Sequence, residues 1–148
     1  MRYFFIPVLF IALIYSCTQV TLEPVDYSWP LESILDIDAN GVIKDQRFAL
    51  IINTKALIEE EKRDNTNIPP NQIRIIRNKE GFYFMTADGF KNVYVFKAGV
   101  GSLELENKIL ITDGGLNAPA FNQRPPYIEL LNGNEKIKLN HEGIVGEK

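Results

Sequence analysis

The stretch IRIIRNKEGFYFMTADGFKNVYVF, residues 73–96, decides the fold class of this chain. Its apolar runs are separated by two turn signals, Asn78-Lys79-Glu80-Gly81 and Asp88-Gly89. Short apolar runs rich in β-branched and aromatic residues, divided by Gly, Asn and Asp, are typical of antiparallel strands joined by tight turns. The stretch therefore predicts strands over 73–77, 82–86 and 93–96.

The same pattern continues towards the C-terminus. Further strand-like runs flank Asn107 and the turn signal Asn132-Gly133-Asn134, over 103–106, 109–111, 127–131 and 136–139. In 103–106 and in 136–139, apolar and charged residues alternate, which predicts strands with one face on a core and the other in water.

Towards the N-terminus, Asn40-Gly41 lies between the apolar runs 34–37 and 42–43. Asn-Gly is the strongest short-range hairpin signal, so a hairpin is expected here. The run 48–52 is apolar throughout and predicts a strand buried on both faces. A short helix is expected over 55–63, with Asn53 or Thr54 as its N-cap.

The bulk composition indicates one globular domain. The chain has 148 residues, of which 45% are hydrophobic and 24% charged, and its formal net charge is −3. Basic residues are interleaved with acidic ones, as in the run 59–64 (EEEKRD), which we interpret as a solvated face. This pattern argues against a phosphate-binding surface, so nucleic acid is not an expected partner. Residues 31–148 are predicted to form a mainly β domain, either a small antiparallel β-sandwich or a partly open barrel, with one short helix.

The first residues have the features of an export signal. Arg2 precedes an uncharged apolar run over residues 3–15. As a helix this run would reach only roughly 20 Å, whereas a hydrocarbon core is about 30 Å thick. A signal peptide over 1–16 is therefore predicted, rather than a membrane-spanning anchor.

Cys17, the only cysteine, follows this run directly, after Leu13-Ile14-Tyr15-Ser16. The segment resembles the lipobox of bacterial lipoproteins: Ile14 and Ser16 match the pattern, and Tyr15 stands where that family has a small residue. The resemblance implies acylation of Cys17 by chains such as palmitate, with residues 17–30 as the lipidated cysteine and a tether. Because Thr18 rather than Asp follows the cysteine, it also implies sorting to the outer membrane of the cell envelope. The alternative is an ordinary secretory signal in which Cys17 is incidental.

The segment Asp36-Ile37-Asp38-Ala39-Asn40-Gly41-Val42-Ile43 resembles the start of an EF-hand or dockerin-type calcium loop. Asp36, Asp38 and Asn40 would supply alternate oxygen ligands, and the glycine would permit the sharp turn. Position 12 of the loop, however, is Arg47 instead of a bidentate acid. We therefore favour the alternative, a β-hairpin whose Asn-Gly turn happens to follow two aspartates, and keep calcium as the lesser hypothesis.

A second candidate site is the connection between the runs at 109–111 and 127–131. Long connections without secondary structure are often functional. Polar side chains that could bind a sugar or a peptide, and an aromatic surface for stacking, lie within residues 112–126: Asn117, Phe121, Asn122, Gln123 and Arg124. The alternative is a proline-stiffened loop that caps one end of the sandwich.

Nothing in the sequence marks a catalytic centre. His141 is the only histidine, which excludes a histidine-rich metal site, and no serine lies in a Gly-x-Ser-x-Gly motif. We therefore expect a non-enzymatic, lipid-anchored module that binds a glycan or a protein of the envelope. The alternative is a structural or accessory lipoprotein that acts through another envelope protein. A third hypothesis is a hydrolase of an envelope polymer that uses paired carboxylates.

Overall fold

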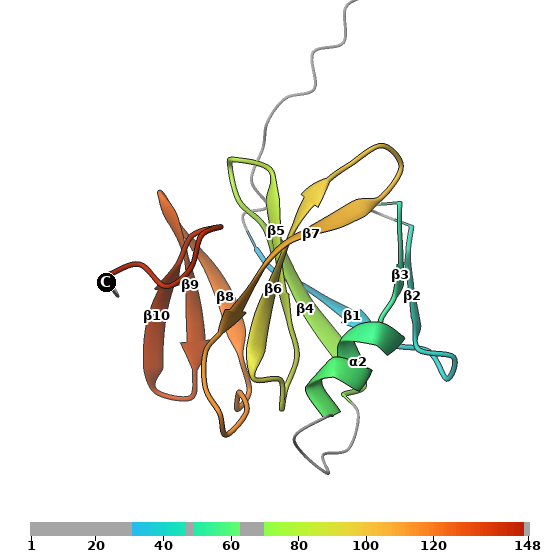
Figure 1. Ribbon diagram of the computed structural model, residues 1–148, viewed down its shortest axis with the longest axis horizontal. Coiled ribbons are helices and arrows are strands. Elements are labelled where there is room, and N and C mark those ends of the chain that lie inside the picture. The colour runs from blue at the N-terminus through green and yellow to red at the C-terminus, as the bar shows by residue number, and fades with distance from the viewer. Residues whose placement is uncertain (1–30, 47–48, 63–69, 147–148) are drawn as a thin grey trace, which may run out of the picture.

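Antiparallel strands dominate the computed structural model, which describes residues 31–46, 49–62 and 70–146 (Figure 1). The elements in chain order are β1 Ser33–Asp36, β2 Val42–Asp45, β3 Leu50–Asn53, α2 Lys55–Lys62, β4 Gln72–Arg77, β5 Phe82–Thr86, β6 Asn92–Ala98, β7 Leu103–Leu110, β8 Ala120–Arg124, β9 Tyr127–Asn132 and β10 Glu135–Leu139. The predicted signal peptide, Cys17 and the tether lie outside the described residues.

The strands form three sheets, and every pairing is antiparallel. The largest sheet has the order β1-β4-β5-β6-β7, a second has the order β10-β9-β8, and β2 pairs with β3. None of the sheets closes on itself in these orders. The prediction of a mainly β fold with one short helix is therefore confirmed, and the arrangement is that of a small β-sandwich.

The five-stranded sheet is the middle layer of the domain. Cross-strand register places Phe84 beside Val95 on one face, and Met85 beside Tyr94 on the other. The Phe84 face lies towards the three-stranded sheet, and the Tyr94 face lies towards α2 and the β2–β3 hairpin (Figure 1). All four side chains are at most 1% exposed, and full burial of a large apolar side chain stabilises the fold by about 1.5–3 kcal/mol.

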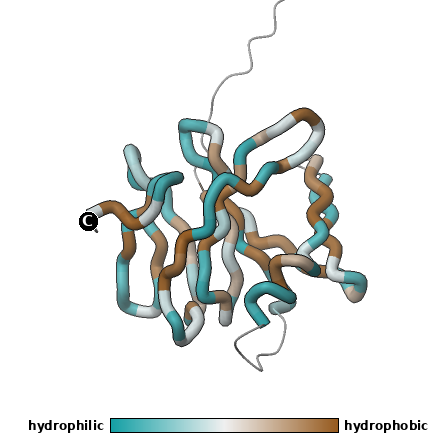
Figure 2. Tube along the Cα trace, in the orientation of Figure 1, coloured by the Kyte–Doolittle hydropathy of each residue, from teal (hydrophilic) through white to brown (hydrophobic). Residues whose placement is uncertain are grey.

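Glu32, just before β1, connects the two larger sheets. Its carboxylate forms an ion pair with Arg74 of β4 and accepts a hydrogen bond from the backbone N–H of Phe121 in β8, at 2.8 Å. Hydrophilic residues gather in several turns, including the one between β4 and β5, while apolar residues lie mainly along the strands (Figure 2). The contacts of Glu32 therefore join the two larger sheets, which local hairpins alone would not connect.

The Asn40-Gly41 turn forms, but the predicted hairpin around it is wrong. The Gly41 N–H donates to the Asp38 carbonyl at 2.9 Å, and Gly41 has a φ of 73°, which glycine adopts without steric cost. The flanking strands then part: β1 joins β4, and β2 joins β3. Pairing with β4 sets Leu35 opposite Ile73, and both are buried. This long-range burial outweighs the local turn preference.

The predicted break at Asn107 is also wrong, because residues 103–110 form the single strand β7. The register against β6 shifts between Val95 and Phe96, so Asn107 lies next to a β-bulge. Its side-chain amide donates to the carbonyls of His141 and Glu142, at 3.1 and 3.0 Å. Asn107 therefore fastens the C-terminal turn to the edge of the large sheet.

Helix α2 forms where it was predicted. The Asn53 side chain accepts a hydrogen bond from the Lys55 N–H, and the Thr54 carbonyl accepts one from the Ile58 N–H. The preceding strand is not buried on both faces as expected, since Ile51 is 77% exposed. No helix among the described residues has the length and apolar character needed to cross a bilayer.

Candidate functional site

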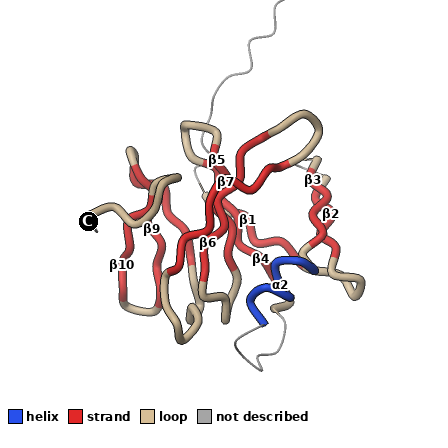
Figure 3. The backbone as a smooth tube through the Cα atoms, viewed as in Figure 1, coloured by secondary structure: helices blue, strands red, loops and turns tan. Residues whose placement is uncertain are grey.

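The α2 side of the five-stranded sheet is only partly covered. Between β3 and the β6–β7 hairpin lies a groove of about 740 Å³, whose lining is mainly apolar. Tyr83, Met85 and Phe96 of the sheet face line it. Figure 3 shows the bordering strands, with β2 and β3 on one side and the β6–β7 hairpin on the other. A concave, largely apolar surface of this size is the usual form of a binding site.

Two walls of the groove are strands whose successive side chains point to opposite faces. On β3, Leu50 and Ile52 pack against the core while Ile51 is exposed. On β7, Leu105 lies opposite Phe96 and remains 53% exposed. Val100, at the end of the β6–β7 hairpin, is fully exposed. Large exposed apolar side chains gathered beside a groove indicate an interaction surface.

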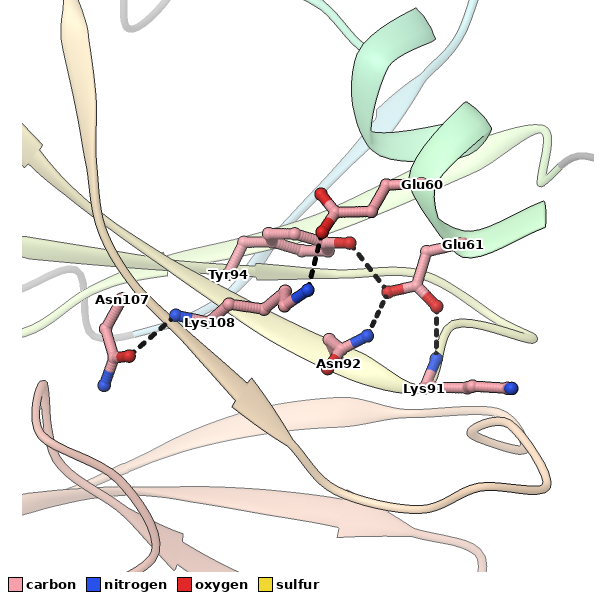
Figure 4. Close-up of polar contacts among 7 residues, drawn as sticks. All are labelled: Glu60, Glu61, Lys91, Asn92, Tyr94, Asn107 and Lys108. Carbon is pink, nitrogen blue, oxygen red and sulfur yellow. Dashed lines mark hydrogen bonds and ion pairs between the residues drawn. The ribbon is translucent and has the colours of Figure 1, made fainter. Parts of the chain in front are cut away.

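Helix α2 forms a third wall, and Glu61 holds this helix on the sheet. The Glu61 carboxylate accepts hydrogen bonds from the Lys91 N–H at 2.7 Å, from the Asn92 side-chain amide at 2.8 Å and from the Tyr94 hydroxyl at 2.8 Å (Figure 4). Burial raises the pKa of Tyr94 well above its usual range, and its hydrogen bond to Glu61 and the nearby negative charges of Glu61 and Glu60 add to this effect. Tyr94 therefore stays protonated and donates to Glu61 at physiological pH.

The neighbouring acid, Glu60, faces the groove. Its carboxylate pairs with the Lys108 ammonium group at 2.6 Å, and both side chains are well exposed (Figure 4). Asn53 and Ser102 also line the groove. The interpretation of the run 59–64 as a solvated face thus suits Glu60 but is wrong for Glu61, while residues 63 and 64 lie outside the described residues.

Two of the candidate calcium ligands, Asp36 and Asp38, accept hydrogen bonds from other groups of the protein. Asp36 accepts a hydrogen bond from the Gln72 side chain at 2.9 Å. Asp38 accepts hydrogen bonds from the backbone N–H groups of Asn40 and Val42, at 2.9 and 2.8 Å. Within the described part of the chain, no group of three or more His, Cys, Asp or Glu side chains could hold a metal ion. Asp38 therefore acts as a turn residue, although the hairpin that the favoured alternative predicts around this turn does not form.

The connection proposed as a ligand loop is shorter than expected, because Ala120–Arg124 forms β8. The reason is pairing with β9 in register, which the proline-rich sequence concealed. The candidate residues then separate. Phe121 is buried in the core at 2% exposure, and Gln123 donates to the Arg77 carbonyl at 2.6 Å.

The other ligand-loop candidates have structural contacts too. The backbone N–H of Asn117 donates to the Asn132 side chain at 2.9 Å, and Asn122 and Arg124 both lie near the Glu129 carboxylate. Gln123 also lines a smaller cavity, of about 380 Å³, beside Pro125, Pro126 and Tyr127.

The groove was not found from the sequence. Most of its residues are apolar and lie in strands, which predicts core positions. They stay uncovered only because of how the distant elements pack. The alternation in 103–106 was the one usable signal, since it set Leu103 and Leu105 on one face. The chain matches no protein-family model, and neither curated proteins nor solved structures give a significant match.

Proposed function

We propose that this chain is an exported, lipid-anchored module of the cell envelope that binds a protein partner in the groove between β3 and β7. The observation that supports binding is the groove itself, with its apolar lining and the exposed Leu105 and Val100 beside it. Export and anchoring are supported by the apolar N-terminal run and by its lipobox-like end at Cys17.

A protein segment suits this groove better than a glycan. Sugars are held by several convergent hydrogen-bonding groups, and the polar side chains that line the groove are few: Asn53, Glu60 and Ser102. Of these, Glu60 is already paired with Lys108. Apolar side chains from a partner would instead exclude water from Tyr83 and Phe96, which are only partly buried, and this is the main source of affinity at protein interfaces.

Anchoring and binding need separate tests. For anchoring, cells that express the protein are labelled with palmitate, and the label is expected on the wild-type chain and absent from Cys17→Ala. For binding, a photo-crosslinking amino acid is placed at Leu105 in the groove and, as a control, at Lys136 on the exposed face of β10. A discrete crosslinked protein from the Leu105 position alone supports the proposal. Equal or absent crosslinking at both positions contradicts it.

A further inference from the structure

Strand β7 is an edge of the five-stranded sheet and pairs only with β6 among the described strands. At the hairpin end, the Gly99 N–H donates to the Ser102 carbonyl at 2.8 Å. Hydrogen-bonded and non-hydrogen-bonded pairs alternate along an antiparallel ladder. Leu103 and Leu105 lie opposite Ala98 and Phe96, so they fall in non-hydrogen-bonded pairs. Their N–H and C=O groups therefore point away from β6, towards the open edge.

The same two residues turn their side chains to the groove. Leu103 and Leu105 both line it, and Leu105 is 53% exposed. Natural edge strands are protected by bulges, prolines or charges. The bulge in β7 lies at Glu106, which has no partner on β6, so residues 103–105 keep a regular register, with both leucines on the groove side. An extended chain added there would place every second side chain in the groove.

The opposite face of this edge carries two acids and one cation. Lys97 of β6 lies opposite Glu104, with its ammonium group 5.8 Å from the centre of the Phe82 ring. Glu104 and Glu106 are exposed, and neither has an ion-pair partner within residues 31–46, 49–62 and 70–146. Lys108, the next cation on β7, forms an ion pair with Glu60. A partner strand with basic residues between its apolar ones would complement both faces. A second copy of β7 would instead bring like charges together, and an acyl chain could not use the open N–H and C=O groups.

We infer that the partner docks by strand addition: an extended polypeptide segment with alternating apolar and basic residues pairs with the edge of β7 at Leu103–Leu105 and sets its apolar side chains in the groove. This inference rests on the proposed function, because it specifies how the groove is occupied. The backbone edge of β7 would orient the partner, and the carboxylates of Glu104 and Glu106 would select a partner of positive charge.

The test measures binding of a labelled ten-residue peptide of alternating valine and lysine to the purified protein, by fluorescence anisotropy. A peptide of alternating valine and glutamate is the charge control. Leu105→Pro removes the outward N–H without removing a bond to β6, and Leu105→Ala is its matched control for the lost side chain. Glu104→Lys with Glu106→Lys reverses the charge, and Glu135→Lys, on the edge strand β10, is the control for that change.

The valine–lysine peptide is expected to bind at least tenfold more tightly than the valine–glutamate peptide, and added salt is expected to weaken it. Leu105→Pro and the double charge reversal are each expected to lower the affinity for the valine–lysine peptide at least tenfold. The controls Leu105→Ala and Glu135→Lys are expected to lower it much less. Equal binding of both peptides, or wild-type affinity in Leu105→Pro, would overturn strand addition.

A fluorescent fatty acid separates this failure from failure of the proposed function. Suppose that the fatty acid binds to the wild-type protein but not to Leu103→Trp, and that no peptide competes with it. Strand addition is then wrong, although the groove still binds a ligand. If the Leu105 crosslink is also absent, the proposed function fails with it.

Discussion

Replacing Glu61 with alanine should loosen α2 from the sheet and destabilise the domain strongly. The carboxylate accepts three hydrogen bonds, from Lys91, Asn92 and Tyr94. Hydrogen bonds to a charged group are each worth about 1.5–3 kcal/mol, but they share one carboxylate and do not add fully. Tyr94 is completely buried, so its hydroxyl cannot regain a water partner. We expect Glu61→Ala to lower the free energy of unfolding by about 3 kcal/mol.

Glu60→Ala is the matched control, since it removes the same side chain one position earlier on the same helix. Its ion pair with Lys108 is exposed on both sides, and exposed pairs contribute only about 0–1 kcal/mol. Urea denaturation followed by circular dichroism measures both variants. The expected difference corresponds to a gap in melting temperature on the order of 10 °C. Equal losses in the two variants, or a loss below about 1 kcal/mol in Glu61→Ala, would refute this reasoning.

Three further predictions concern pH, metal and backbone. The raised pKa of Tyr94 contributes stability that is complete below the unfolded value of about 10 and declines as the pH rises above it; melts from pH 8 to 11 should show a decline that Tyr94→Phe flattens, and an unchanged slope would contradict this. Calcium at about 1 mM should leave the melting temperature of EDTA-treated protein unchanged; a rise on the order of 10 °C that Asp38→Ala abolishes would restore the calcium hypothesis. Gly115→Ala should cost about 2 kcal/mol or more, because its φ is 85° and a Cβ would meet the Gly89 carbonyl oxygen at 2.9 Å. Gly101→Ala, at a φ of 72° with open space around it, should cost less in the same urea titration.

Local pattern was enough to predict some of the hairpins of this fold, but not β2–β3 or β8–β9. The turns at 78–81 and 132–134 each join strands that are close in sequence, so turn chemistry and alternation specify them together. The pairing of β1 with β4 joins segments far apart in the chain, and no local signal encodes it. At Asn40-Gly41 the local signal even pointed to the wrong partner, because burial of Leu35 against Ile73 decided the pairing.

The candidate site was harder to predict, for a related reason. Glu61 and Glu60 are identical in type and adjacent in sequence, yet one holds the helix and the other faces the groove. Which of them turns inwards depends on where Tyr94 lies in the assembled sheet. The groove likewise exists because the β2–β3 hairpin covers only part of the sheet face, which is a property of packing between distant elements.

Amide hydrogen exchange at Leu103 and Leu105 would show whether a partner strand pairs with β7. Both N–H groups point to the open edge of β7, so they should exchange readily in the free protein. On addition of the valine–lysine peptide, strand addition predicts slower exchange at these two amides, while Glu104, already bonded to β6, changes little. If the peptide binds and the amides of Leu103 and Leu105 exchange as before, the partner does not pair with β7, and the account of this edge as the docking site is contradicted.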